Sequence, residues 1–206
     1  TMASQMAEAD ETVSSLYSVK SEQATMLSFD TYNYLVHYFG QPQGSMADDP
    51  NGTLGGDYEF VISDATADRI ELKGKKYGNR IVMKAFSADQ TWKQYLTKIK
   101  KVEDDAFFYE YDLLMDGLYT GQMIRSNYTF ILTYYDEIGK VHQKTVPFMF
   151  TADGLRFHEP VTIDGQTMQN FVWKNELISF VCTDEGATGV KMKGIYIDGY
   201  QSYDYY

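Results

Sequence analysis

Residues 129–182 read TFILTYYDEIGKVHQKTVPFMFTADGLRFHEPVTIDGQTMQNFVWKNELISFVC. Runs of Val, Ile, Thr, Tyr and Phe, which favour β-strands, alternate here with short turn-forming segments. The expected strands cover residues 129–135, 140–151, 155–158, 161–163, 166–173 and 176–182. Pro147 lacks a backbone N–H, so its position in the second run indicates an edge strand or a bulge. The spacing predicts an antiparallel meander.

The same pattern extends outward from this stretch. Residues 58–62, 69–73 and 79–85 form a second group of expected strands, and residues 190–197 form a last one. A helix is expected over residues 87–102, where Trp92, Tyr95, Leu96, Ile99 and Val102 recur at helical spacing. A shorter helix is expected over residues 29–39, with Asp30 as its N-cap and Gly40 just past its end.

These elements predict a mostly β protein with one or two helices. The antiparallel meanders allow two lipocalin-like or open-barrel β units on either side of the amphipathic helix. The expected boundaries are residues 1–86 for the first β unit, 87–104 for the packed helix and 105–206 for the second β unit. A faint echo of residues 27–29 and 58–61 in residues 155–157 and 169–172 raises an internal duplication as one interpretation.

Length and charge exclude several classes of protein. A chain of 206 residues is long enough to bury a core without disulfides or metals. Its 18 basic and 29 acidic residues give a net charge of −11, which argues against a nucleic-acid partner. The apolar runs are too short to span a bilayer. The single cysteine, Cys182, lies in an apolar stretch and is expected to pack as a small hydrophobic residue.

No catalytic motif is complete in this sequence. The three histidines, His37, His142 and His158, lack the paired spacing that a zinc site needs. No Gly-x-Ser-x-Gly turn occurs, and residues 74–76 lack the rest of a phosphate-binding loop. We therefore assign no catalytic residue, expect no cofactor, and favour a binding protein over an enzyme. The alternative is a hydrolase that uses paired carboxylates, with candidates Asp48, Asp49, Asp57, Asp104, Asp105 and Glu110.

A loop rich in Gly, Pro and Asp is expected over residues 40–57, and loops of this kind often carry function. Its oxygen-bearing side chains, Asp48, Asp49, Asn51 and Asp57, are candidate Ca²⁺ ligands, although a plain solvated loop is the favoured interpretation.

Aromatic residues make up 16% of the chain. Exposed tyrosines stack on sugar rings or on peptide side chains, whereas buried ones fill a β core and form cross-strand pairs. The core interpretation is favoured for most of them. Four tyrosines close to the acidic loop are the candidate ligand-binding residues: Tyr32, Tyr34, Tyr38 and Tyr58.

Several strings occur together in a characteristic order. They are LYSVKS at 16–21, LSFDTYN at 27–33, HYF at 37–39, GGDYEFVI at 55–62 and LKGKK at 72–76. TYYD at 133–136, DGLRF at 153–157 and EPV at 159–161 follow them. With these strings, most of residues 16–182 resembles a family of Bacteroidetes lipoproteins known as domain of unknown function number 4302.

The resemblance implies a location rather than a reaction. Its members are exported, lipid-anchored proteins of the cell envelope, encoded beside nutrient-uptake systems of the SusC and SusD type. The resemblance also implies that this chain lacks a signal peptide, the lipidated cysteine that would anchor it, and early strands of the first β unit. We therefore expect a binding or accessory module of an outer-membrane uptake complex, with a glycan or peptide as ligand. The alternatives are the hydrolase and a structural scaffold that docks an uptake partner.

Overall fold

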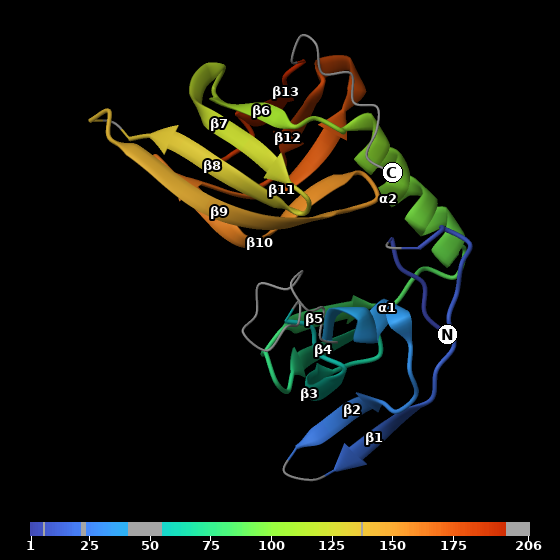
Figure 1. The fold of residues 1–206 in the computed structure, drawn as a ribbon. Coiled ribbons are helices and arrows are strands. Elements are labelled where there is room, and N and C mark those ends of the chain that lie inside the picture. The colour runs from blue at the N-terminus through green and yellow to red at the C-terminus, as the bar shows by residue number, and fades with distance from the viewer. Residues whose placement is uncertain (6, 22–23, 41–54, 137, 197–206) are drawn as a thin grey trace. The chain divides into compact units, whose positions relative to one another are not determined.

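A computed structural model describes residues 1–5, 7–21, 24–40, 55–136 and 138–196 of the chain. The chain divides into two compact units, Thr1–Gln94 and Tyr95–Tyr206, and each contains its own sheet (Figure 1). Strands dominate both units, and the helices are few and short. The predicted mostly β fold class is therefore confirmed.

The first unit contains a five-stranded antiparallel sheet whose strands lie side by side in the order of the sequence. The strands are β1 (Tyr17–Ser21), β2 (Thr25–Phe29), β3 (Glu59–Ala65), β4 (Arg69–Gly74) and β5 (Arg80–Lys84). The meander expected between residues 58 and 85 is confirmed. The sequence pattern does not predict β1 and β2, since most side chains of β1 are exposed and its Ser and Lys residues break the strand signal.

The helix expected over residues 29–39 begins later than its pattern predicts. Phe29 ends β2, and helix α1 covers Tyr34–His37, followed by the 3₁₀ turn η1 at Tyr38–Gly40. Asn33, not Asp30, is the N-cap, because its side-chain oxygen accepts a hydrogen bond from the Leu35 N–H at 3.0 Å. The Asp30 carboxylate instead accepts a hydrogen bond from the Ser28 hydroxyl.

Helix α2 spans Trp92–Asp105, and its existence is confirmed. Thr91 and Gln94 form a capping box, in which the Thr91 hydroxyl accepts from the Gln94 N–H and the Gln94 side chain accepts from the Thr91 N–H. Leu96, Ile99 and Val102 form its buried face. None of the described helices is long and apolar enough to cross a membrane.

The second unit contains a closed antiparallel barrel of eight strands. They are β6 (Glu110–Met115), β7 (Leu118–Ser126), β8 (Thr129–Tyr135), β9 (Val141–Phe150), β10 (Gly154–Ile163), β11 (Gln166–Lys174), β12 (Ser179–Cys182) and β13 (Val190–Gly194). A short 3₁₀ turn, η3 (Asn175–Leu177), precedes β12. Each strand pairs with its chain neighbours, and β13 pairs with β6 to close the barrel.

Aromatic side chains fill the barrel interior. Phe130 stacks on Phe148 with ring centroids 4.3 Å apart, and Tyr111 contacts Phe130 edge to face at 5.6 Å. Phe157 and Phe180 are also fully buried. Barrels of eight strands have an interior just wide enough for side chains, and these rings occupy it. The favoured interpretation of the aromatic residues, a β core, therefore holds for this group.

Two strand predictions in the barrel need correction. Residues 155–158 and 161–163 belong to one strand, β10, which contains a bulge between Arg156 and Val161. β6 and β7 are not predicted, although Tyr111, Leu113 and Met115 alternate. The ladder between β9 and β10 covers only residues 148–150 of β9, so Pro147 lies just outside it. The missing N–H of Pro147 therefore costs that ladder no hydrogen bond.

Candidate ligand-binding site

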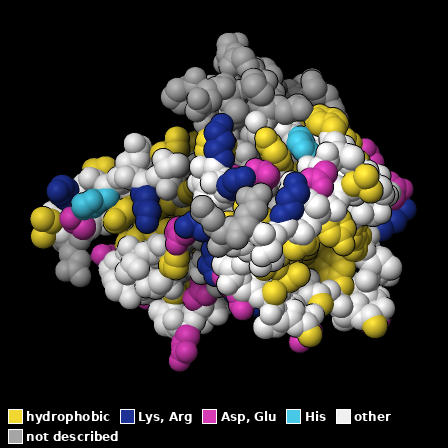
Figure 2. Space-filling model, turned by 90° about the horizontal axis from the view of Figure 1, so that it is seen from below, with side chains coloured by type: hydrophobic (Ala, Val, Ile, Leu, Met, Phe, Trp, Pro, Cys, Tyr) yellow, Lys and Arg dark blue, Asp and Glu magenta, His cyan; other side chains and the backbone are white. Residues whose placement is uncertain are grey.

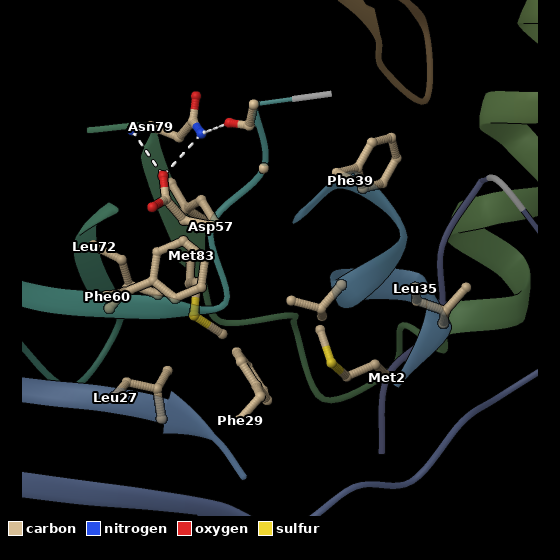
Figure 3. A pocket seen from close by; sticks show the side chains of 14 residues that line it. Met2, Leu27, Phe29, Leu35, Phe39, Asp57, Phe60, Leu72, Asn79 and Met83 are labelled. Atoms are coloured by element: carbon tan, nitrogen blue, oxygen red, sulfur yellow. Dashed lines mark hydrogen bonds between the residues drawn. The ribbon is translucent and has the colours of Figure 1, made fainter. Parts of the chain in front are cut away.

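The first unit has a cavity of about 490 Å³ on one face of its sheet (Figure 3). Strands β2 to β5 form its floor, α1 and Phe39 form one wall, and Met2 from the N-terminal segment adds to the lining. The apolar lining residues are Met2, Leu27, Phe29, Leu35, Val36, Phe39, Phe60, Leu72, Ile81 and Met83. In the space-filling view, hydrophobic side chains gather around a hollow on the face turned to the viewer (Figure 2).

The strand register explains why these side chains share one face. Leu27 of β2 lies opposite Phe60 of β3, and Leu72 of β4 lies opposite Ile81 of β5. Directly opposed residues point to the same side of a sheet, and each strand returns to that side every second residue. The cavity floor is therefore a direct product of the alternating pattern.

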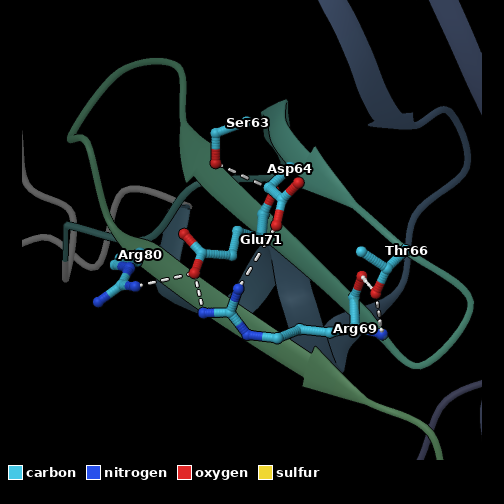
Figure 4. A network of polar contacts seen from close by, with 6 residues as sticks. All are labelled: Ser63, Asp64, Thr66, Arg69, Glu71 and Arg80. Carbon is cyan, nitrogen blue, oxygen red and sulfur yellow. Dashed lines mark hydrogen bonds and ion pairs between the residues drawn. The ribbon is translucent and has the colours of Figure 1, made fainter.

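The opposite face of the sheet carries a network of polar side chains on β3, β4 and β5 (Figure 4). The Glu71 carboxylate is shared by Arg69 and by Arg80, whose guanidinium lies 3.0 Å away. Arg69 also pairs with Asp64 at 3.5 Å. Exposed ion pairs contribute little to stability, so this network mainly gives the face its polar character.

One end of the cavity is closed by Asp57 and Asn79 (Figure 3). One carboxylate oxygen of Asp57 accepts from the backbone N–H groups of Lys76 and Tyr77 at 2.8 and 3.1 Å. The other accepts from the Asn79 side chain at 2.9 Å. Both oxygens are thus engaged in holding the turn between β4 and β5 against the segment that carries Asp57. Gly74 allows this approach, because a Cβ there would lie 1.9 Å from the carboxylate.

These contacts bear on the predicted Ca²⁺ ligands. Asp57 holds a turn through its carboxylate, and Asp48, Asp49 and Asn51 lie outside the described residues. Within the described part of the chain, no group of three or more His, Cys, Asp or Glu side chains is arranged to hold a metal ion.

The four candidate tyrosines separate into different environments. Tyr58 stacks on His37 with ring centroids 5.0 Å apart, and Tyr32 contacts the same imidazole at 5.4 Å. The three rings form a row in which both tyrosines are exposed and His37 is half-buried. Tyr38 contacts Phe39 edge to face instead. The Tyr34 hydroxyl donates a hydrogen bond to Glu11, which raises the pKa of that phenol. The structure thus brings Tyr32 and Tyr58 together through His37, a residue that the sequence analysis does not assign to a site.

Two of the described carboxylates proposed for a hydrolase, Asp105 and Glu110, have separate partners. Asp105 pairs with Lys101 at 2.7 Å, and this hydrogen bond holds the pKa of Asp105 below its usual range. Glu110 accepts a hydrogen bond from Gln122. Among the described residues, no hydrogen bond joins the side chains of Asp104, Asp105 and Glu110 to one another.

Cys182 faces the barrel interior, and burial raises the pKa of its thiol to about 11. We expect a thiol reagent such as dithiobis-nitrobenzoate to react with native protein at pH 8 at least about a hundredfold more slowly than with protein unfolded in urea, since only the accessible thiolate reacts. The measurement is the absorbance change at the two conditions. Rapid stoichiometric reaction of the native protein would contradict the assigned burial.

The site residues that sequence reasoning missed are mostly apolar. Leu27, Phe60, Leu72, Ile81 and Met83 alternate as any core strand does, and nothing in their spacing distinguishes a cavity floor from a packed core. The sequence indicates for Asn79 only a place in a turn and at the start of the strand expected over residues 79–85. One signal in the sequence could have indicated a cavity. Neighbouring strands repeat the same apolar alternation, and only one short helix is available to cover the face that they form.

The fold and this site define a two-unit, mostly β protein that combines an open sheet with a closed barrel and carries a largely apolar cavity on the sheet. The family described as domain of unknown function (DUF4302) matches residues 1–175, and the chain belongs to this family. The predicted resemblance is therefore confirmed. No curated protein and no solved structure matches the chain.

Proposed function

We propose that the chain is a ligand-binding module whose site is the cavity of the first unit and whose ligand is a peptide. The observation that carries the proposal is the cavity itself, which has ten apolar side chains in its lining and a volume typical of small-ligand sites, about 300–1,000 Å³. Burial of apolar side chains from a ligand is the interaction that such a lining stabilises.

The polar groups of the cavity favour a peptide over a glycan. A sugar needs free donors and acceptors for its hydroxyl groups, because a buried hydroxyl without a hydrogen bond is costly. The Asp57 and Asn79 side chains already bond to each other and to the backbone around them. An apolar peptide side chain makes no such demand. The row of Tyr32, His37 and Tyr58 is the surface that would suit a glycan, since sugar rings stack on aromatic rings.

The proposed setting is the cell envelope. The resemblance to lipid-anchored proteins encoded beside uptake systems supports a peptide-binding accessory role at an outer-membrane uptake complex. In this setting the full-length protein is held at the membrane by its lipid anchor. Labelling of the native protein with radioactive palmitate in its host tests this part of the proposal. Protein that incorporates no palmitate would overturn it.

The cavity is tested with two neighbouring substitutions on β5. Met83 lines the cavity and Val82 does not, yet their exposed fractions are similar, 48% and 39%. We expect Nile red, a neutral apolar dye, to bind the unsubstituted protein saturably at one site. Met83→Lys should weaken this binding at least about tenfold, because it places a charge at an apolar wall. Val82→Lys should leave it unchanged.

The same assay distinguishes the ligand classes. Short peptides with apolar side chains should displace the dye, whereas neutral cello- and xylo-oligosaccharides should not. Equal loss of dye binding in both variants, or no saturable binding at all, would contradict the cavity as a ligand site. Oligosaccharide binding that is lost in Tyr32→Ala would instead assign a glycan to the aromatic row.

A further inference from the structure

Strand β5 is an edge of the five-stranded sheet, so one side of its backbone is not paired with another described strand. The Gly74 N–H donates to the Asn79 carbonyl at 2.8 Å, and the Ala85 N–H donates to the Asp68 carbonyl at 3.0 Å. Hydrogen-bonded pairs alternate along an antiparallel ladder, so Ile81 and Met83 also bond to β4. The N–H and C=O groups of Arg80, Val82 and Lys84 therefore point outward, and they have no hydrogen-bond partner among the described residues.

The side chains of β5 point alternately toward the cavity and toward the opposite face of the sheet. Ile81 and Met83 line the cavity, but each is still partly exposed, so the cavity remains open along this edge. Arg80, Val82 and Lys84 point to the opposite, polar face. A strand added beside β5 would place every second side chain over the open side of the cavity.

We propose that an extended peptide pairs antiparallel with β5 and inserts two apolar side chains beside Ile81 and Met83. The inference rests on the proposed function and specifies how that peptide is recognised. Backbone hydrogen bonds to Arg80, Val82 and Lys84 would supply affinity, and the cavity would select the apolar side chains.

Charge on the opposite face specifies the rest of the peptide. Residues directly opposite Arg80 and Lys84 lie on the polar face, where opposite charges across a strand pair are stabilising. Lys84 has no ion-pair partner among the described residues, and Arg80 reaches only Glu71. The peptide that fits therefore has the five-residue pattern acidic–apolar–any–apolar–acidic. Its acidic residues lie opposite Lys84 and Arg80, and its apolar residues lie opposite Met83 and Ile81.

The other edge strand fits less well. The outward backbone groups of β1 belong to Tyr17, Val19 and Ser21, because the Asp30 N–H donates to the Leu16 carbonyl and fixes the alternation. No residue of β1 lines the cavity. A peptide on that edge would gain backbone pairing without a pocket for its side chains.

The test uses the peptide acetyl-Ser-Glu-Leu-Thr-Val-Glu-Ser-amide with a fluorescent label, titrated against the whole chain by fluorescence anisotropy. One isomer is N-methylated at Thr and at the second Glu, whose N–H groups would face β5. The matched isomer is N-methylated at Leu and Val, whose N–H groups would face away. We expect the first isomer to bind at least about tenfold more weakly than the second, since it loses two backbone hydrogen bonds.

The outcomes separate this inference from the proposed function. If both isomers bind equally and Met83→Lys still weakens them, the cavity takes peptides but the edge pairing is wrong. If neither binds while Nile red does, the edge pairing is likewise overturned and the cavity stands as a ligand site. If neither the peptide nor the dye binds, the proposed function fails as well.

Two further readouts address charge and edge pairing. A peptide with Lys in place of both Glu residues should bind more weakly, although the net charge of −11 favours it at long range. Amide hydrogen exchange at Arg80, Val82 and Lys84 should be fast in the free protein and slow in the complex. Slow exchange without peptide would show that the edge is already paired in the free protein and would overturn the proposal.

Discussion

Replacement of Phe130 by alanine is expected to lower the free energy of unfolding of the barrel by about 3–5 kcal/mol, the range for truncating a buried aromatic residue. Phe130 is 1% exposed, and it contacts three other rings, those of Tyr111, Phe148 and Phe157. Its removal leaves a cavity at the centre of the barrel that the closed sheet cannot collapse to fill.

The neighbouring residue supplies the control. Ile131 is 38% exposed and points outward from the same strand, so Ile131→Ala should cost less than about 1 kcal/mol. Urea unfolding is followed by Trp173 fluorescence in a Trp92→Phe background, because Trp173 packs on Phe180 at 4.9 Å within the barrel. Similar losses for the two alanine variants would contradict the described barrel interior.

The second large effect is expected for Asp57→Ala. This change should destabilise the first unit by about 2–4 kcal/mol, because it leaves the Lys76 and Tyr77 N–H groups without their acceptor and removes one of the two acceptors of the Asn79 side-chain amide. Asp57 is 7% exposed, so water replaces the carboxylate poorly. Binding of Nile red should be lost together with the turn that closes the cavity.

Asp68→Ala is the matched control for this prediction. Asp68 is exposed in the turn between β3 and β4, and only its backbone carbonyl takes part in a described hydrogen bond. Its replacement should change stability by less than about 0.5 kcal/mol. Amide hydrogen exchange at Lys76 and Tyr77 reports the effect locally. Unchanged exchange at both amides in Asp57→Ala would show that the carboxylate does not hold the turn.

Local patterns predicted many elements but not the pairing between them. The strand expected over residues 129–135 coincides with β8, and the spacing of Leu96, Ile99 and Val102 correctly indicates α2. Closure of the barrel depends on β13 meeting β6, which are far apart in the sequence. Strand periodicity carries no information on such a partner. The short similarity between residues 27–29 and 58–61 and residues 155–157 and 169–172 does not correspond to two similar units, because one unit contains an open sheet and the other a closed barrel.

The site was harder to predict than the fold. Tyr32 and Tyr58 do lie together, but no motif points to His37, the imidazole that joins them. The cavity depends on side chains from four strands and from helix α1, which begins after Asn33 and not after the predicted cap Asp30. Because apolar residues at a cavity and in a core follow the same alternation, only the three-dimensional arrangement of Leu72 and Met83 shows the difference.

Methyl NMR of the whole chain tests the central claim, that the cavity of the first unit is the ligand site. On titration with the acidic–apolar peptide, the methyl signals of Leu27, Leu72, Ile81 and Met83 should shift, because these side chains line the cavity. Those of Leu113 and Leu132, buried in the barrel, should stay in place. Shifts confined to the barrel signals, or no shift of any cavity signal at saturating peptide, would contradict the claim.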